Sequence, residues 1–549
     1  MQIFNIREYK TQVGKRLKTW KEENFAHRLW ERDPLLWFSE PVTEITDRLG
    51  WLDLPETMQE KLDDMTSFAE QVKTEGIEHV VLLGIGGSSL APDVFQRTFS
   101  HSRGYPELFV LDSTHPAAVS TLAEKIDFDH TLFLVSSKSG TTLETISLFK
   151  FFWKQVSQKM DKPGAHFAAI TDPGTLLVRM AQERGFRQVF YSPLDVGGRY
   201  SAFTVFGLVP AALIGMDVHR LLGRAREVAK DVLFQDSEKK ASGLFLGAVL
   251  GELTESRDKL TFSTSSSLES FPDWLEQLVA ESLGKDGKGI IPVVNEPLAS
   301  IDIYGKDRLF VYLSMKSEEN REVEKRLNAM KSAGHPIIHI NLSEKEDLGR
   351  EIFLWETAVA TAGAVLGIHP FNQPDVVLTK ELTRRVMGKG AGRREEGNEV
   401  KTVSIYDTES LTSALKDWIG QAEQGDYIAL QAYLCPCTKT KELLQRIRFE
   451  LLQKTHLATT LGYGPRFLHS TGQLHKGGPN NGLFLQLVDE PETDLPIPEA
   501  GYSFGTLIKA QALGDYHALK SLGRRVLRVN LNSEVKTGLE RLAELTRSA

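Results

Sequence analysis

Hydroxyl side chains and one lysine gather in a short run of the chain. Five Ser and Thr residues accompany Lys138 between Ser137 and Thr145. An apolar segment that predicts a strand precedes the run, and a pattern that predicts a helix follows it. The first turn of a helix offers unpaired N–H groups and the positive end of its dipole, which favour an anion. The run therefore predicts a binding site for a monophosphate group.

The same run allows a second interpretation. Thr141 and Glu144 have the spacing of a capping box, which would only start the helix. A cap needs neither Lys138 nor the neighbouring serines, so the phosphate site is the preferred interpretation. Both functions are compatible with each other.

A glycine-rich run, Gly84 to Leu90, follows an earlier predicted strand. Glycines there let the backbone turn tightly and approach a ligand. The run resembles a dinucleotide-binding fingerprint, but Ser89 stands where the third glycine is expected. Two adjacent serines suit a single phosphate or a sugar better than a pyrophosphate. A plain turn between strand and helix is the alternative.

Three later segments carry residues of suitable chemistry. Arg199 follows a glycine pair and could hold its guanidinium against developing negative charge. Glu281 falls near the C-terminal end of a predicted helix, where a carboxylate could have a raised pKa and act as a base. Lys380 follows a segment with two prolines that predicts a turn. Taken singly, each is equally compatible with a solvated surface residue.

The elements that must position these residues form four regions. Residues 1–75 predict an amphipathic helical lead-in, and residues 76–220, 221–386 and 401–549 each alternate strands with helices, which is typical of parallel sheets covered on both faces. Residues 387–400, rich in Gly and charge, predict a linker. The predicted strands are His79–Leu83, Leu108–Leu111, Thr131–Val135 and His166–Thr171; Lys259–Ser263, Arg308–Met315 and Pro336–Leu342; and Tyr427–Leu434, Gly482–Val488 and Arg525–Leu531.

Composition narrows the class of protein. Apolar residues make up 41% and charged residues 25% of the 549 residues, as in ordinary globular chains. A net charge of -8 makes nucleic acid an unexpected partner. We expect no signal peptide and no membrane segment, and a cytoplasmic location. The two cysteines, Cys435 and Cys437, could be a metal or redox pair, but two ligands do not complete a metal site, so we expect ordinary thiols and no metal.

Together, and in this order, the five segments resemble the signatures of the phosphoglucose isomerase family. The resemblance covers about residues 75–380 and implies two doubly wound sugar isomerase (SIS) subdomains with parallel sheets, followed by a further α/β unit. It implies an aldose–ketose isomerase that interconverts glucose 6-phosphate and fructose 6-phosphate in glycolysis and gluconeogenesis. The reaction passes through a cis-enediol(ate) and uses no cofactor.

The resemblance also implies roles for single residues. Glu281 is the expected catalytic base, Arg199 the residue that stabilises the enediolate, and Lys380 the residue that handles the sugar ring. The expected phosphate and sugar contacts are Gly87, Ser88, Ser137, Lys138, Ser139, Thr142 and Gln373. Family members commonly pair, so a homodimer is expected.

One family feature is missing from its usual place. The family has a ring-opening histidine downstream of the base, whereas no histidine lies between Glu281 and His335. The segment after residue 400 resembles the isomerase half of bifunctional transaldolase and phosphoglucose isomerase proteins. Our hypothesis is that His475 or His469, in this segment, supplies the missing group, with a neighbouring subunit as a conceivable source. Two exposed loop histidines are the alternative.

Two other classes of protein compete with the isomerase. A sugar-phosphate sensor would bind the same ligands without turnover, but such proteins usually carry a DNA-binding module, and this acidic chain shows none. A dehydrogenase that uses the loop at Gly84 would need the full glycine fingerprint, which Ser89 interrupts.

Overall fold

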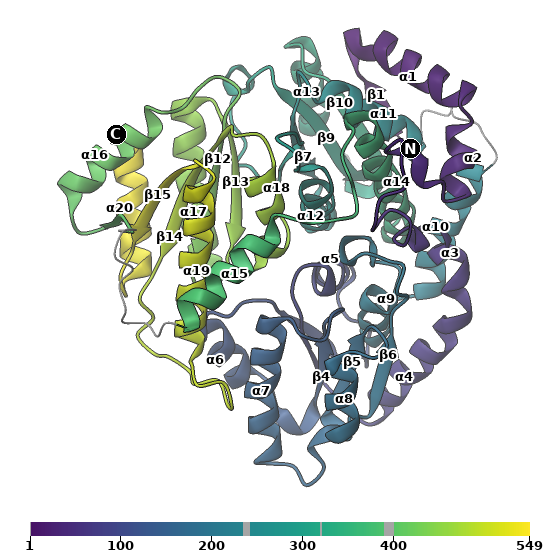
Figure 1. The fold of residues 1–549 in the computed structure, drawn as a ribbon, viewed down its shortest axis with the longest axis vertical. Coiled ribbons are helices and arrows are strands. Elements are labelled where there is room, and N and C mark those ends of the chain that lie inside the picture. Colours follow the sequence, from purple (N-terminus) through teal and green to yellow (C-terminus); the bar gives the residue numbers. More distant parts are fainter. Residues whose placement is uncertain (1, 234–241, 319–320, 389–399, 549) are drawn as a thin grey trace.

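The computed structural model describes residues 2–233, 242–318, 321–388 and 400–548. Three five-stranded sheets, each covered by helices, form three α/β units that surround the centre of the molecule (Figure 1). Most of the predicted linker, residues 389–399, falls outside the described residues.

The first sheet has the order β3-β2-β4-β5-β6, with all neighbours parallel. Its strands alternate their side chains between two cores: Val80 and Leu82 pack on one face, and Val81 and Leu83 on the other. Such double burial is what a parallel sheet with helices on both faces requires. The elements are β2 (His79–Leu83), α5 (Leu90–Phe99), β3 (Glu107–Leu111), α6 (Pro116–Lys125), β4 (Thr131–Ser136), α7 (Leu143–Ser157), β5 (Phe167–Thr171), α8 (Leu176–Glu183), β6 (Gln188–Tyr191) and α9 (Val205–Leu213).

The second sheet has the order β1-β10-β9-β7-β8. Its four later strands are parallel, but β1 (Gln2–Asn5) joins the edge antiparallel to β10, so the sheet is mixed rather than purely parallel. The remaining elements are α10 (Val218–Leu233), α11 (Gly243–Leu253), β7 (Lys259–Thr264), α12 (Phe271–Leu283), β8 (Ile291–Val293), β9 (Arg308–Met315), α13 (Arg321–Ser332), β10 (Ile337–Leu342) and α14 (Leu348–Leu366). The next helix, α15 (Val376–Gly388), packs instead against α19 (Phe504–Ser521) of the third unit (Figure 1).

The lead-in is therefore not helical throughout. Its helices are α1 (Lys10–Glu22), α2 (Phe25–Trp30), α3 (Leu54–Thr57) and α4 (Leu62–Thr74). The strand β1 precedes them and is only four residues long, too short for an alternating pattern to stand out in the sequence. It forms because β10 offers an unpaired edge of backbone N–H and C=O groups.

The third sheet has the order β11-β15-β14-β12-β13, with all neighbours parallel. Its elements are β11 (Thr402–Ser404), α16 (Thr408–Ile419), β12 (Tyr427–Tyr433), α17 (Thr438–Thr455), β13 (Ala458–Tyr463), α18 (Gly472–Gly477), β14 (Gly482–Val488), α19 (Phe504–Ser521), β15 (Arg525–Asn530) and α20 (Val535–Ser548). All ten predicted strands are present, within two residues of their expected bounds.

The three sheets share one strand order. The strand β2 lies between β3 and β4, β7 lies between β8 and β9, and β12 lies between β13 and β14. In each sheet the chain therefore leaves this strand first on one side and then on the other. In open α/β sheets the carboxyl ends of the strands at such a switch point form the usual ligand crevice. For the first sheet this point lies between β2 and β4, which carry the glycine-rich run and the hydroxyl-rich run.

Candidate active site

The hydroxyl-rich run forms the loop between β4 and α7. The Ser137 and Thr142 hydroxyls lie 2.9 Å apart, and Gly140 turns the loop with a φ of 66°. The Lys138 ammonium does not face the other hydroxyls, because it donates to both carboxylate oxygens of Asp172, at 2.9 and 2.8 Å. Asp172 thus neutralises the one cation of the run.

A cavity of about 120 Å³ opens beside this loop. Ser139 and Thr142 line one wall, and Lys380 of α15 lines another. Arg384, one turn further along α15, lines the same cavity and was missed in the sequence, although its i+4 spacing from Lys380 places it on the same helix face. Two cations and a row of hydroxyls therefore face a space that suits an anionic group.

Glu144 has a different partner from the one the capping box predicts. The N-cap of α7 is Thr142, whose side chain makes no capping bond, so that alternative is wrong. The Glu144 carboxylate instead lies 3.0 Å from Nε2 of His469 and accepts a 2.7 Å hydrogen bond from Gln511. Burial opposes its ionisation, yet His469 holds the pKa of this carboxyl below its ordinary value. The local sequence indicates only a helix start at Glu144 and gives no sign of its contact with His469.

Arg199 and Glu281 form an ion pair with Nη1 3.0 Å from Oε1. The Arg199 side chain is only 3% exposed. It also donates to Gln373 Oε1 at 3.0 Å and to the carbonyl oxygens of Pro370 and Asn372, both at 2.9 Å. The structure therefore brings together three of the predicted residues, Arg199, Glu281 and Gln373, although they belong to distant parts of the chain.

Gln277 connects this ion pair to the third unit. Its amide nitrogen donates to Glu281 Oε2 at 3.0 Å and to the backbone oxygen of His469 at 2.8 Å. Gln277 lies four residues before Glu281 on α12, so helical spacing alone places both on one face. The sequence did not single out Gln277 as a site residue, because a glutamine side chain is uncharged.

The glycine-rich loop packs closely against both neighbours. A Cβ atom on Gly87 would lie 2.4 Å from the carbonyl of Gly198, and one on Gly86 would lie 2.8 Å from Cβ of His469. Gly86 also has a φ of 60°. The absence of a side chain at Gly86 and Gly87 therefore lets the loops that carry Arg199 and His469 pack closely against this loop. Ser88 stays half-buried, and its carbonyl accepts from the Ser136 hydroxyl.

A buried lysine supports the loop that carries Gln373. Lys285, two residues after the end of α12, is 2% exposed and donates to the backbone oxygen of His369. Burial, together with the nearby Arg199 charge, pulls its pKa well below the ordinary value.

The two candidate histidines have different environments. His469 lines the cavity beside Lys380 and reaches it from the same chain. His475 does not: its ring is buried between Phe467 and Phe484, and Nδ1 lies 3.3 Å from the Gln431 amide nitrogen. Burial lowers the pKa of His475 well below its ordinary value. Neither histidine is an exposed loop residue.

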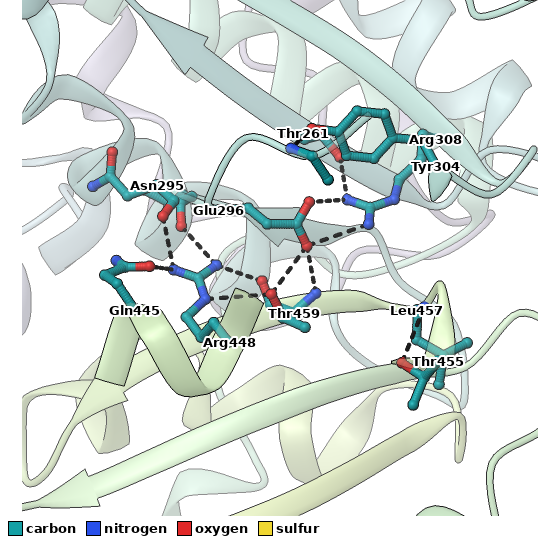
Figure 2. A network of polar contacts seen from close by, with 12 residues as sticks. Thr261, Asn295, Glu296, Tyr304, Arg308, Gln445, Arg448, Thr455, Leu457 and Thr459 are labelled. Atoms are coloured by element: carbon teal, nitrogen blue, oxygen red, sulfur yellow. Dashed lines mark hydrogen bonds and ion pairs between the residues drawn. The ribbon is translucent and has the colours of Figure 1, made fainter. Parts of the chain in front are cut away.

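A buried ionic network fixes the third unit against the second and so sets where His469 lies (Figure 2). Glu296 is bound by Arg308 at 2.8 Å and by the backbone N–H of Thr459 at 2.7 Å. Arg448 of α17 donates to the carbonyl oxygens of Asn295 and Val294, at 2.9 and 3.1 Å. Glu296 lies in the stretch between Glu281 and His335 that contains no histidine.

Within the described residues, no group of three or more His, Cys, Asp or Glu side chains is arranged to hold a metal ion. None of the helices in these parts of the chain combines the length and the apolar character needed to cross a membrane. Cys435 and Cys437 are both free thiols.

Comparisons with known proteins agree with this geometry. A family model described as phosphoglucose isomerase matches residues 52–307. A glucose-6-phosphate isomerase of Mycoplasmopsis pulmonis is 30% identical over 389 residues, which cover 62% of this chain and 90% of the relative. One from Rubrobacter xylanophilus is 28% identical over 396 residues, covering 63% and 91%.

Solved structures show the same fold. A hypothetical protein from Thermus thermophilus has a TM-score of 0.60 and 25% identity, covering 70% of this chain and 100% of its own. A glucose-6-phosphate isomerase from Chlamydia trachomatis has a TM-score of 0.53 at 21% identity, covering 67% and 79%. Fold and site thus define an α/β sugar isomerase of the SIS type, an aldose–ketose isomerase. Within that class, the chain belongs to the phosphoglucose isomerase family.

Proposed function

We propose that this enzyme interconverts glucose 6-phosphate and fructose 6-phosphate, in glycolysis and gluconeogenesis, by moving a proton between C2 and C1 through a cis-enediol(ate). The observation that carries the proposal is the Arg199–Glu281 ion pair, 3.0 Å long, which Gln277 links to His469. A carboxylate can remove and return the proton. A guanidinium beside it can stabilise the negative charge that develops on the substrate oxygens.

The substrate phosphate binds in the cavity at the start of α7. Ser139 and Thr142 supply hydroxyls there, and Lys380 and Arg384 supply positive charge. Ser137 does not line the cavity and acts by holding the Thr142 hydroxyl, 2.9 Å from its own. Lys138 acts indirectly, because its ammonium is bound to Asp172 and braces the loop. Gly87 and Ser88 approach the sugar from the neighbouring loop, at the switch point of the first sheet.

His469 opens the sugar ring in this scheme. Its Nε2 is bound to the Glu144 carboxylate, which leaves Nδ1 to exchange a proton with the ring oxygen. Glu144 then stabilises the charged imidazole, as a buried carboxylate beside a histidine does in other acid–base sites. His475 has no access to the cavity and takes no part.

The three units divide this work. Residues 76–220 hold the phosphate, residues 221–386 carry Glu281 and Lys380, and residues 401–549 deliver His469. A homodimer stays a prediction; the site as described takes each of its groups from one chain.

One assay tests the proposal. The purified protein is incubated with fructose 6-phosphate and no added cofactor, and glucose 6-phosphate is measured. Formation of glucose 6-phosphate is expected. Binding of the sugar phosphate without any product would contradict the proposal and favour a sensor, whereas a strict requirement for a nicotinamide would favour a dehydrogenase.

A further inference from the structure

The third unit contains a second cavity that the isomerase reaction does not use. Its volume is about 340 Å³, within the range of small-molecule sites. Tyr433 at the end of β12, Val488 at the end of β14 and Arg528 of β15 line it, together with Lys509 of α19. All these strands meet on one side of α19 (Figure 1).

The cavity lies at the switch point of the third sheet. The chain passes from β12 to β13 on one side and then to β14 on the other, so the crevice opens between the carboxyl ends of β12 and β14. Tyr433 and Val488 are the last residues of these two strands. In the first unit the same topological position, between β2 and β4, carries the hydroxyl-rich loop. The third unit thus repeats the architecture of a ligand site.

Arg528 is the unusual residue in this cavity. It is only 6% exposed, and no carboxylate among the described residues lies within ion-pair distance of its guanidinium. Asp515, the carboxylate whose charge acts on Arg528, is already paired with Lys476 at 2.6 Å. Arg528 donates from Nη1 to Gln486, while its Nε finds no acceptor. The Tyr516 ring lies 5.9 Å from the guanidinium but supplies no counter-ion. A buried cation with an unused donor and no ion pair is costly unless an anion completes it.

The acidic residues of the same wall are already engaged. Asp489 lies 3.0 Å from Nε2 of His115, and Glu490 accepts from the Asn530 amide at 2.9 Å. Neither forms an ion pair with Arg528. The Glu490 charge has no cationic partner among the described residues, but Glu490 and Lys509 are both exposed to water at the rim, so the buried charge without a counter-ion is the positive charge of Arg528.

We infer that the third unit binds a small oxyanion, a phosphate ester or a carboxylate, in this cavity, with Arg528 as its buried anchor. A guanidinium presents a planar fork of donors that matches either group. The site is separate from the isomerase site, because Lys380, His469 and Glu144 line the other cavity. The inference does not depend on the proposed reaction.

Equilibrium dialysis with labelled inorganic phosphate tests the inference on the full-length protein. We expect two phosphates per chain. The variant Arg528→Gln should lose the second phosphate, with an affinity at that site at least about tenfold weaker, since hydrogen bonds to a charged group are the stronger ones. The variant Lys380→Ala should weaken only the first. Arg541→Gln, a half-buried arginine of the same unit that contacts Thr408 and does not line this cavity, is the matched control and should keep both.

Citrate in place of phosphate distinguishes the source of the oxyanion. Competition by citrate only at the site that Arg528→Gln removes would assign a carboxylate ligand, whereas competition by sugar phosphates at that site would assign a phosphate ester. Wild-type protein with one phosphate per chain, or unchanged binding in Arg528→Gln, would overturn the inference.

A second measurement needs no substitution, in case Arg528→Gln does not fold. Phenylglyoxal modifies arginine side chains, and peptide mass spectrometry reports the modification of Arg528. Phosphate or citrate should slow the modification of Arg528 at least about tenfold while leaving that of Arg541 unchanged. Equal rates with and without both anions would contradict the inference.

Discussion

Nε2 of His469 lies 3.0 Å from Oε1 of Glu144, and this contact joins the third unit to the first turn of the helix beside the hydroxyl-rich loop. The two residues lie more than three hundred positions apart in the chain. Their contact turns a helix start into part of an acid–base site, and it makes the ring-opening role of His469 testable.

Replacing His469 should separate ring opening from isomerisation. In His469→Asn we expect turnover of ring-closed substrate to fall by about 10² to 10⁴, the usual contribution of general acid–base catalysis. The rate of proton exchange between water and open-chain substrate should change far less, because Glu281 and Arg199 are untouched. Stopped-flow assays with ring-closed substrate and isotope exchange measure the two.

The control for this experiment is His475→Asn. Its ring packs between two phenylalanines and does not reach the cavity, so turnover per folded molecule should stay near that of wild type. A loss of turnover in His475→Asn with full activity in His469→Asn would reverse the assignment of the two histidines.

Removing the proposed base should abolish turnover without abolishing binding. Glu281→Gln keeps the shape of the side chain and one acceptor oxygen, so it can accept from Arg199 or from Gln277 but not from both, and an amide cannot take up the proton at neutral pH. We expect kcat to fall at least about 10³-fold and the Kd for fructose 6-phosphate to change little. Glu269→Gln, an exposed glutamate paired with Lys441 just before α12, is the control. Normal kcat in Glu281→Gln would show that another group is the base.

The geometry of Arg199 matters as well as its charge. Arg199→Lys keeps the charge, but an ammonium cannot hold Glu281, Gln373 and two backbone oxygens at once. We expect kcat/KM to fall by about 10² to 10³, as when one transition-state donor is removed. Arg187→Lys, whose side chain pairs with Glu75 and lies over the Phe68 ring away from the site, should behave as wild type. Equal activities for both variants would remove Arg199 from the mechanism.

The ionic network of Figure 2 should hold the third unit in place. Glu296→Ala leaves Arg308 buried without its partner, and losing one member of a buried pair costs about 3 to 5 kcal/mol of unfolding free energy. The exposed pair of Glu322 with Lys325 provides a contrast, since Glu322→Ala should cost less than about 1 kcal/mol. Urea unfolding measures both. Similar losses in the two variants would show that the network adds no special stability.

Glu276 of α12 gives stability a pH dependence. Burial and the nearby Asp273 charge raise the pKa of this carboxyl to about 8. The folded protein therefore binds a proton that the unfolded chain has released, so the free energy of unfolding falls as pH rises from about 5 to about 8. Each pKa unit corresponds to about 1.4 kcal/mol. In Glu276→Gln this contribution disappears, so the stability gained over wild type should grow across that range. A gap that stays constant with pH would contradict the raised pKa.

Much of the fold could be predicted because its signals are local. Apolar runs such as Arg308–Met315 and Gly482–Val488 coincide with observed strands residue for residue, since both faces of a parallel sheet are buried. The strands that were missed, β1, β6, β8, β11 and β13, are short or carry mixed polarity. Their pairing depends on an edge that another strand supplies, and a single sequence does not show that edge.

The site divides in the same way. The residue types of Ser137–Thr145, Arg199 and Glu281 already indicated phosphate binding and proton transfer, because hydroxyls at a helix start and a lone carboxylate near a helix end have definite chemistry. Gln277 and Arg384 could have been predicted as site residues, because each lies four residues from a predicted site residue on the same helix. Gln511 and the second cavity around Arg528 were not, because no local pattern connects them with anything nearby in the chain.

The sequence by itself determined the class of protein, the order of its strands and helices, and the residue types that carry the reaction. Tertiary structure alone decided which histidine can serve. Chain position favours neither His469 nor His475, but the packing of α18 buries His475 among aromatic rings, and the network at Glu296 presents His469 to Glu144. Such a choice depends on how units far apart in the chain dock, and docking is set by buried contacts that no local pattern encodes.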